Sequence, residues 1–220
     1  MNTPTSREGN LIRYTVYLLA MLMVLGINQL VVKTVPLKTW DVVLYLLVAA
    51  AVLLFFVYRF NREARFFEKD TNLSWLDYCC LTIALTVVVA VTRISVSYLQ
   101  ASGRLPLFGF QQNYLRHEAV NLFWFLILSQ GIVIPILQGF LASGFLFNYL
   151  FRGKSVLTGV VGILASALIF AGLNFQFTAS LFLLNAFYGA LFAWSYLVSQ
   201  SVWMPTFLAV ANGLLMIVMM

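Results

Sequence analysis

Few side chains in this sequence could carry out hydrolysis. The single histidine, His117, is followed by Glu118, and no aspartate, glutamate or histidine occurs after that glutamate. A metal site needs three or four converging ligands, and general base catalysis needs a titratable side chain close to the substrate. We therefore expect no catalytic residue, no metal ion and no cofactor in the C-terminal half, and the sequence favours a protein that is not an enzyme.

The charged residues near the membrane edges leave one alternative open. Adjacent residues on a helix point about 100° apart, so His117 and Glu118 would form a poor catalytic pair, although with Arg93 they are the candidates for a displaced active site. Arg93 lies inside an apolar stretch, where an ionisable side chain is costly and usually functional. It could equally reach the nearer membrane edge along its aliphatic chain, and Asp77 or Glu118 could pair with it.

Amide side chains are spaced through the C-terminal half. Gln130 and Gln138 are eight residues apart, so they would lie on roughly one face of a helix. Amides buried in a membrane hydrogen bond between helices or line a binding cavity, and the sequence leaves both roles open. The possible functional polar residues are Arg93, Gln130, Gln138, Asn174 and Asn212, with Asn185 as a further buried amide.

The elements that must position these residues are membrane-spanning helices. The chain of 220 residues is 62% hydrophobic and 9% charged, with a mean hydropathy of +0.94. A soluble domain would have about 25% charged residues. A span needs about 20 apolar residues. We therefore predict an all-α polytopic helix bundle, one domain over 1–220, with about seven spans: 11–32, 41–59, 76–100, 119–149, 156–175, 178–199 and 201–220.

Small residues and turn residues refine this prediction. Pro135 could kink the long fourth span. The segment 102–117 contains glycine, proline and amides, so we predict a loop or a surface-lying piece there and no further helix. Small residues at four-residue spacing predict a tightly packed bundle, because they let helix backbones approach closely. These pairs are Gly139 and Ser143, Gly162 and Ser166, Ala167 and Ala171, Gly189 and Ala193, and Ala209 and Gly213.

The excess of 13 Lys and Arg over 7 Asp and Glu indicates orientation in a membrane and not a nucleic-acid partner. With seven spans, one side has eight basic residues and the other has four, which are Lys33, Lys38, Arg104 and Arg116. The eight are Arg7, Arg13, Arg59, Arg62, Arg65, Lys69, Arg152 and Lys154. The positive-inside rule then predicts a cytoplasmic N-terminus.

Three stretches carry a resemblance to a known family. They are QGFLASG from Gln138 to Gly144, FAGLN from Phe170 to Asn174, and SVWMP from Ser201 to Pro205. Their order resembles the CPBP family of intramembrane proteases, also called Abi or CAAX-protease-like. That family has a Glu-Glu-x-x-x-Arg box, a Phe-x-x-x-His box and a His-x-x-x-Asn box. The resemblance implies a CPBP-like core at 119–220, after N-terminal helices at 1–118.

The same resemblance implies that the family's glutamate activates water, its histidines assist, and its asparagine stabilises the developing oxyanion. The spacing to the second box favours Ser143 over Arg152 as the position of the box arginine. The chain departs from the family at every catalytic position and keeps the box phenylalanine as Phe170. Gln138 and Gly139 replace the glutamates, Ser143 the arginine, Asn174 and Ala209 the histidines, and Gly213 the asparagine. Asn212 is one residue away and would point about 100° from the expected face.

We therefore expect a degenerate, catalytically inactive member of this family in a bacterial cytoplasmic membrane. The resemblance implies a scaffold, a regulator of a membrane partner such as a kinase or cell-wall enzyme, or a bacteriocin self-immunity protein that contacts the bacteriocin target. The alternatives are an endopeptidase with a displaced site, and a small transport or lipid-binding subunit that uses the amide-lined interior.

Overall fold

The computed structural model describes residues 7–34, 36–63, 74–153, 155–176 and 178–220, and every regular element in these ranges is helical. Before the C-terminal half come α1 (Arg7–Lys33), α2 (Thr39–Glu63), α3 (Trp75–Ala101) and the short α4 (Gly109–His117). One broken helix then runs through α5 (Val120–Leu126), η2 (Ile127–Val133), α6 (Ile134–Gly139), η3 (Phe140–Phe145) and α7 (Leu146–Tyr149). The last three are α8 (Val156–Leu173), α9 (Ala179–Ser199) and α10 (Trp203–Val218).

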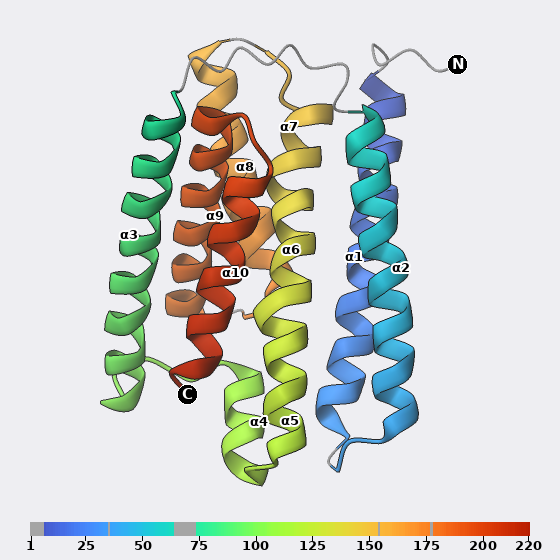
Figure 1. Ribbon diagram of the computed structural model, residues 1–220, viewed down its shortest axis with the longest axis vertical. Helices are drawn as coiled ribbons and strands as arrows, with labels where there is room; N and C mark the ends of the chain where they lie inside the picture. Colours follow the sequence, from blue (N-terminus) through green and yellow to red (C-terminus); the bar gives the residue numbers. More distant parts are fainter. Residues whose placement is uncertain (1–6, 35, 64–73, 154, 177) are drawn as a thin grey trace.

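The membrane bundle predicted from composition is confirmed. Among the described residues, 6 helices are long and apolar enough to span a membrane, and α10 is a shorter apolar helix. These elements run alternately up and down, and the two termini lie at opposite ends of the bundle (Figure 1). The prediction for 102–117 was partly wrong, because α4 forms there. Gln111, which is 3% exposed, accepts from the Phe108 backbone and donates to the Met216 carbonyl, so these contacts fix a helix where composition indicated a loop.

Local capping signals in the sequence fix where two of the helices begin. Ser74 caps α3 by accepting a bond from the Asp77 backbone, and Ser155 caps α8 by accepting one from Thr158. These side chains satisfy backbone donors that a helix N-terminus leaves unpaired.

The broken helix from α5 to α7 contains two π-helical segments, η2 and η3. In the wider π register, residue i bonds to residue i−5, as the Ile134 backbone does to Ser129. Residue 135 would bond to Gln130 in that register, but Pro135 has no N–H to donate. The predicted disturbance at Pro135 is therefore a change of helical register that leaves the Gln130 carbonyl without this donor.

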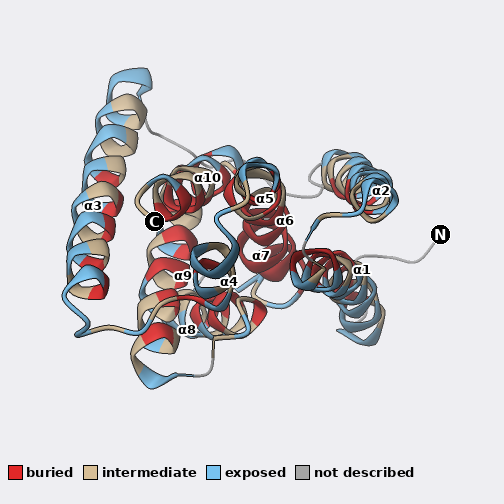
Figure 2. Cartoon of the chain, turned by 90° about the horizontal axis from the view of Figure 1, so that it is seen from below, coloured by how far each residue is buried: buried red, intermediate tan, exposed pale blue. Residues whose placement is uncertain are grey.

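The broken helix forms the centre of the molecule. Viewed from below, buried residues concentrate on α6 and α7, with α1 and α2 on one side and α8, α9 and α10 on the other (Figure 2). The helix α3 lies outermost and packs on α10. The α1–α2 pair joins the centre through Tyr17, whose ring stacks on Phe145 at 4.1 Å and whose hydroxyl accepts from Arg59 Nε at 3.1 Å.

Basic residues gather at the two ends as the topology requires. Arg7, Arg13, Arg59, Arg62 and Arg152 lie toward the end of the bundle that holds the N-terminus. Lys33, Lys38, Arg104 and Arg116 lie toward the end that holds the C-terminus. Arg65, Lys69 and Lys154 fall outside the described residues. The orientation relative to the cytoplasm stays a prediction from these charges.

Candidate functional site

The three predicted boxes come together in the C-terminal half. Gln138 and Gly139 end α6, and Ser143 follows in η3. Phe170 lies on α8, with Asn174 directly after that helix, and Ala209 and Gly213 lie on α10. Ala142, Phe170 and Ala209 belong to one buried apolar cluster, which also contains Tyr188, Phe192, Met204 and Leu208. The boxes therefore meet around apolar side chains.

Two of the box positions are filled by direct helix contact. A Cβ atom on Gly139 would lie 2.8 Å from Thr206 Oγ1 and 3.0 Å from Thr206 Cα. A Cβ atom on Gly213 would lie 2.8 Å from the Gln130 carbonyl oxygen, 2.8 Å from Pro135 Cγ and 3.0 Å from the Gly131 carbonyl oxygen. Any side chain at these two glycines would force the helices apart. The close approach predicted from small residues is confirmed here.

Other small residues act in the same way between α7, α8 and α9. A Cβ atom on Gly162 would overlap the Phe147 ring, and one on Gly189 would lie 2.9 Å from Ala167 Cα. The α8–α9 contact thus also rests on a glycine against a neighbouring backbone, which is how helices pack closely where lipid removes the usual hydrophobic drive.

The remaining polar box residues are enclosed. Gln138 is 2% exposed and Ser143 is 1% exposed, and Gln138 Nε2 has no hydrogen-bond partner among the described residues. Asn174 is half-buried and donates its Nδ2 to the Phe170 carbonyl at 2.8 Å. Neither amide is hydrogen bonded to the other in the described structure.

Arg93 does not reach the membrane edge. Its side chain is 1% exposed, and its Nε and Nη2 both donate to Asn212 Oδ1, at 3.0 and 2.7 Å. The predicted partners do not pair with it, because Asp77 bonds to Ser74 and Glu118 is exposed in a left-handed conformation with φ 45°. Asn212, displaced by one residue from the family's asparagine position, thus joins α10 to α3.

Aromatic rings complete the surroundings of this guanidinium. Arg93 Cζ lies 5.0 Å from the centre of the Tyr188 ring and 5.6 Å from that of Phe108. Such faces attract a cation, the more strongly where water is excluded. Nη1 is buried and has no partner among the described residues. Tyr188 was not among the residues predicted from the sequence, although its place three residues after Asn185 puts it on the same face of α9.

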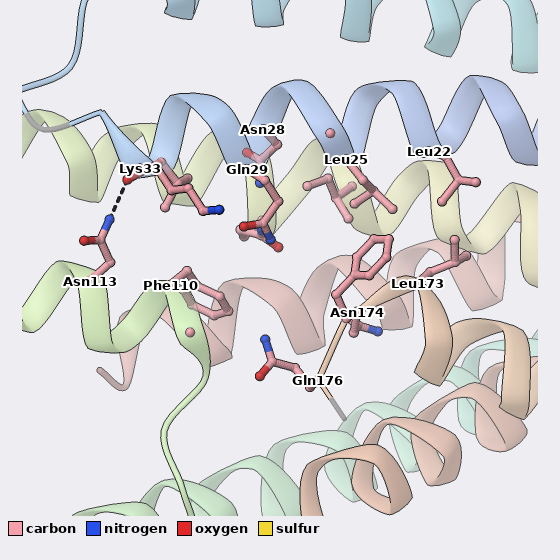
Figure 3. Close-up of a pocket in the computed structure, with 16 residues that line it drawn as sticks. Leu22, Leu25, Asn28, Gln29, Lys33, Phe110, Asn113, Leu173, Asn174 and Gln176 are labelled. Carbon is pink, nitrogen blue, oxygen red and sulfur yellow. Dashed lines mark hydrogen bonds between the residues drawn. The ribbon is translucent and has the colours of Figure 1, made fainter. Parts of the chain in front are cut away.

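A separate cavity of about 680 Å³ lies between α1, α4, η2 and the turn after α8 (Figure 3). Gln130 and Asn174 line this cavity, whereas Gln138 does not. The sequence analysis missed its other polar walls, which are Asn28, Gln29, Lys33, Asn113 and Gln176. Adjacent amides at 28 and 29 inside an otherwise apolar span were the signal that could have found them.

The candidate residues for a displaced active site, His117 and Glu118, lie apart from the boxes and from the cavity. His117 and Glu118 are both exposed at the end of α4, and His117 Nδ1 lies 2.9 Å from the Asn113 carbonyl oxygen. Cys79 and Cys80 are free thiols. In the described ranges no three His, Cys, Asp or Glu side chains are grouped closely enough to hold a metal ion.

The Arg93–Asn212 contact predicts non-additive stability effects. Asn212→Leu leaves a buried guanidinium without its acceptor, so it should cost roughly 1.5–3 kcal/mol. The double variant with Arg93→Met removes both polar groups and should unfold closer to the wild-type temperature than Asn212→Leu alone. Thermal unfolding in detergent, followed by tryptophan fluorescence, measures this. As a control, Asn148→Leu, at the Tyr196 contact on α7, should combine additively with Arg93→Met; additivity in the Asn212 cycle would contradict the assignment.

The contact at Gly213 predicts that the family's asparagine cannot be restored. Gly213→Asn should destabilise the protein by about 1–3 kcal/mol, because its Cβ overlaps the backbone of η2. Gly172→Asn is the matched control, since a Cβ there meets no atom within 4 Å. Unfolding temperatures of the two variants provide the measurement. Equal unfolding temperatures would contradict the prediction, because they would show that α10 can shift to accept a side chain at Gly213 without loss of stability.

Residues 120–215 match the family model described as type II CAAX prenyl endopeptidase Rce1-like. No curated protein and no solved structure shows significant similarity to the chain. The matched residues contain all three boxes, so the resemblance drawn from those boxes is confirmed over this segment. Residues 120–215 of this membrane protein are therefore similar to the Rce1-like type II CAAX prenyl endopeptidases.

Proposed function

We propose that this protein is a catalytically inactive member of its family that acts as a membrane scaffold. The observation that carries the proposal is the backbone contact at Gly139 and Gly213. At these two positions the family has a glutamate and an asparagine, and here neighbouring helices occupy the space that those side chains need. The site has therefore changed in its packing as well as in its residue types.

The chemistry of the surrounding residues supports the same proposal. Where the boxes meet, Phe170, Ala209 and Ala142 form an apolar cluster, and a general base alone contributes about 10²- to 10⁴-fold to a rate. Gln138 and Ser143 cannot take up a proton in the physiological range. A substrate carbonyl at this point would meet neither a base nor an activated water.

The scaffold would act on another membrane protein. Suitable partners are a kinase, a cell-wall enzyme or the target of a bacteriocin, in a bacterial cytoplasmic membrane. The N-terminal end has five basic residues in the described ranges, against four at the other end, and Arg65, Lys69 and Lys154 add to the first group in the sequence. This asymmetry supports a cytoplasmic N-terminus.

Proteolysis assays test the catalytic half of the proposal. Purified protein in detergent micelles, incubated with a farnesylated CAAX peptide, should give no product above a no-protein control. The same result is expected for unprenylated transmembrane peptides, because the described interior lacks a base at the boxes. Mass spectrometry of the peptides measures cleavage. Product formation that disappears in Glu118→Gln or His117→Ala would contradict the proposal and support the displaced active site.

The second part of the proposal, a scaffold role, requires that the protein contacts another protein in the native membrane. A photo-crosslinking phenylalanine is placed at Leu164 or Leu168 on α8, both 59% exposed, and at Leu47 on α2, which is 66% exposed. We expect one helix face to give a cross-link to a single protein of defined mass and the other face to give none. Cross-links to lipid alone at all three positions would contradict a scaffold role.

A further inference from the structure

The cavity beside α1 has a polarity gradient along the axis of that helix. Its α1 wall runs from Lys33 to Leu22, a distance of about 16 Å at 1.5 Å per residue. Lys33 and Asn113 lie at one end, Gln29 and Asn28 in the middle, and Leu25 and Leu22 at the other end (Figure 3). The facing wall changes similarly, from Asn113 through Phe110 and Gln176 to Leu173.

The polar end lies at the membrane edge. It is built from the last turn of α1, the first turns of α4 and the turn after α8. Asn113 donates to the Val32 carbonyl and so connects α4 to α1 across this end. The apolar end reaches between α1 and η2–α6 at the level of Ile134. A ligand that fills the cavity would have a polar group at the edge and an apolar group inside.

The charge on the cavity wall favours an anionic headgroup. Among the described residues that line the cavity, Lys33 carries the single formal charge, and the other polar groups are amides. Amide N–H groups and an ammonium are donors for phosphate oxygens. A volume of about 680 Å³ fits one small headgroup with part of a chain, within the usual range for ligand sites.

A buried amide on the α1 wall has no hydrogen-bond partner in the described structure. Asn28 is 0% exposed, and both its Nδ2 and its Oδ1 have no hydrogen-bond partner among the described residues. Leaving such a group unpaired costs about 1–3 kcal/mol. Asn28 lies on the cavity wall, midway between the charged end and the leucine end.

We propose that this cavity binds one membrane lipid whose phosphate headgroup has a net negative charge. The headgroup lies against Lys33 and the amides at the membrane edge, and the acyl chain lies along Leu25, Leu22 and Leu173. The site is outside the apolar cluster of the boxes, so it does not depend on the scaffold proposal.

Native mass spectrometry of the full-length protein, released from a neutral maltoside detergent, tests this site. The probes are phosphatidylglycerol and phosphatidylcholine with identical acyl chains. We expect the wild type to retain phosphatidylglycerol about two- to fivefold more strongly, as a partly exposed ion pair allows. Lys33→Gln should abolish this preference. Equal retention of both lipids by the wild type would overturn the headgroup assignment.

A matched pair of variants locates the binding. Gly26 lines the cavity, and a Cβ there meets no atom within 4 Å, as is also true of Gly172 outside the cavity. Gly26→Phe fills the space and should lower phosphatidylglycerol retention about tenfold or more, whereas Gly172→Phe should leave it unchanged. Equal retention in both would assign the lipid to the outer surface and overturn the site.

Two further arms keep the test decisive. Unfolding temperature and monodispersity show whether Gly26→Phe folds, and exposed Lys33→Gln tests the same site if it does not. Millimolar glycerol phosphate, the headgroup without its chains, should not displace phosphatidylglycerol. Displacement by glycerol phosphate alone would show a site for a soluble anion and would overturn the lipid proposal.

Discussion

The backbone contact between α10 and the η2–α6 segment is the constraint on which the rest of the structure depends. Pro135 deprives the Gln130 carbonyl of its helical donor, and Gly213 lies against that carbonyl and the one at Gly131. Helices in lipid associate through close packing and polar contacts, because lipid chains are as apolar as the side chains. The absence of a side chain at Gly213 therefore brings α10 to the centre of the bundle, and Gly139 against Thr206 sets its register.

Once α10 is placed, the position of α3 follows from one polar contact. The apolar part of α3 is only 22% buried, so packing alone holds it weakly. Arg93 compensates by placing two donors on Asn212 Oδ1 and its charge against the Tyr188 ring. Burying an arginine without a carboxylate is costly, and an amide oxygen with two aromatic faces offsets only part of that cost. Such a contact gives a unique position to an otherwise lipid-facing helix.

Sequence reasoning predicted the spans and the boxes because both depend on local patterns. Runs of about 20 apolar residues define spans, and the spacing from Gln138 to Asn174 and Pro205 defines the family segment. It failed for α4, where Gln111 bonds to a residue more than one hundred positions away. It could not choose between the two roles of Arg93 either, since that choice depends on Asn212, on a different helix. The cavity was missed for the same reason, because its amides come from four separate elements.

The amide side chains of the C-terminal half lie in two different surroundings. Gln138 is enclosed where the boxes meet, while Gln130 and Asn174 line the cavity nearer the C-terminal end of the bundle. An apolar cluster containing Phe170 and Ala209 lies between α8, α9 and α10. Because Gly139 and Gly213 leave no room for side chains, a polar side chain at either position would require α10 to move away from η2 and α6. Moving α10 would also displace Asn212 and release Arg93, so the packing at these two glycines depends on the same contacts that hold the bundle together.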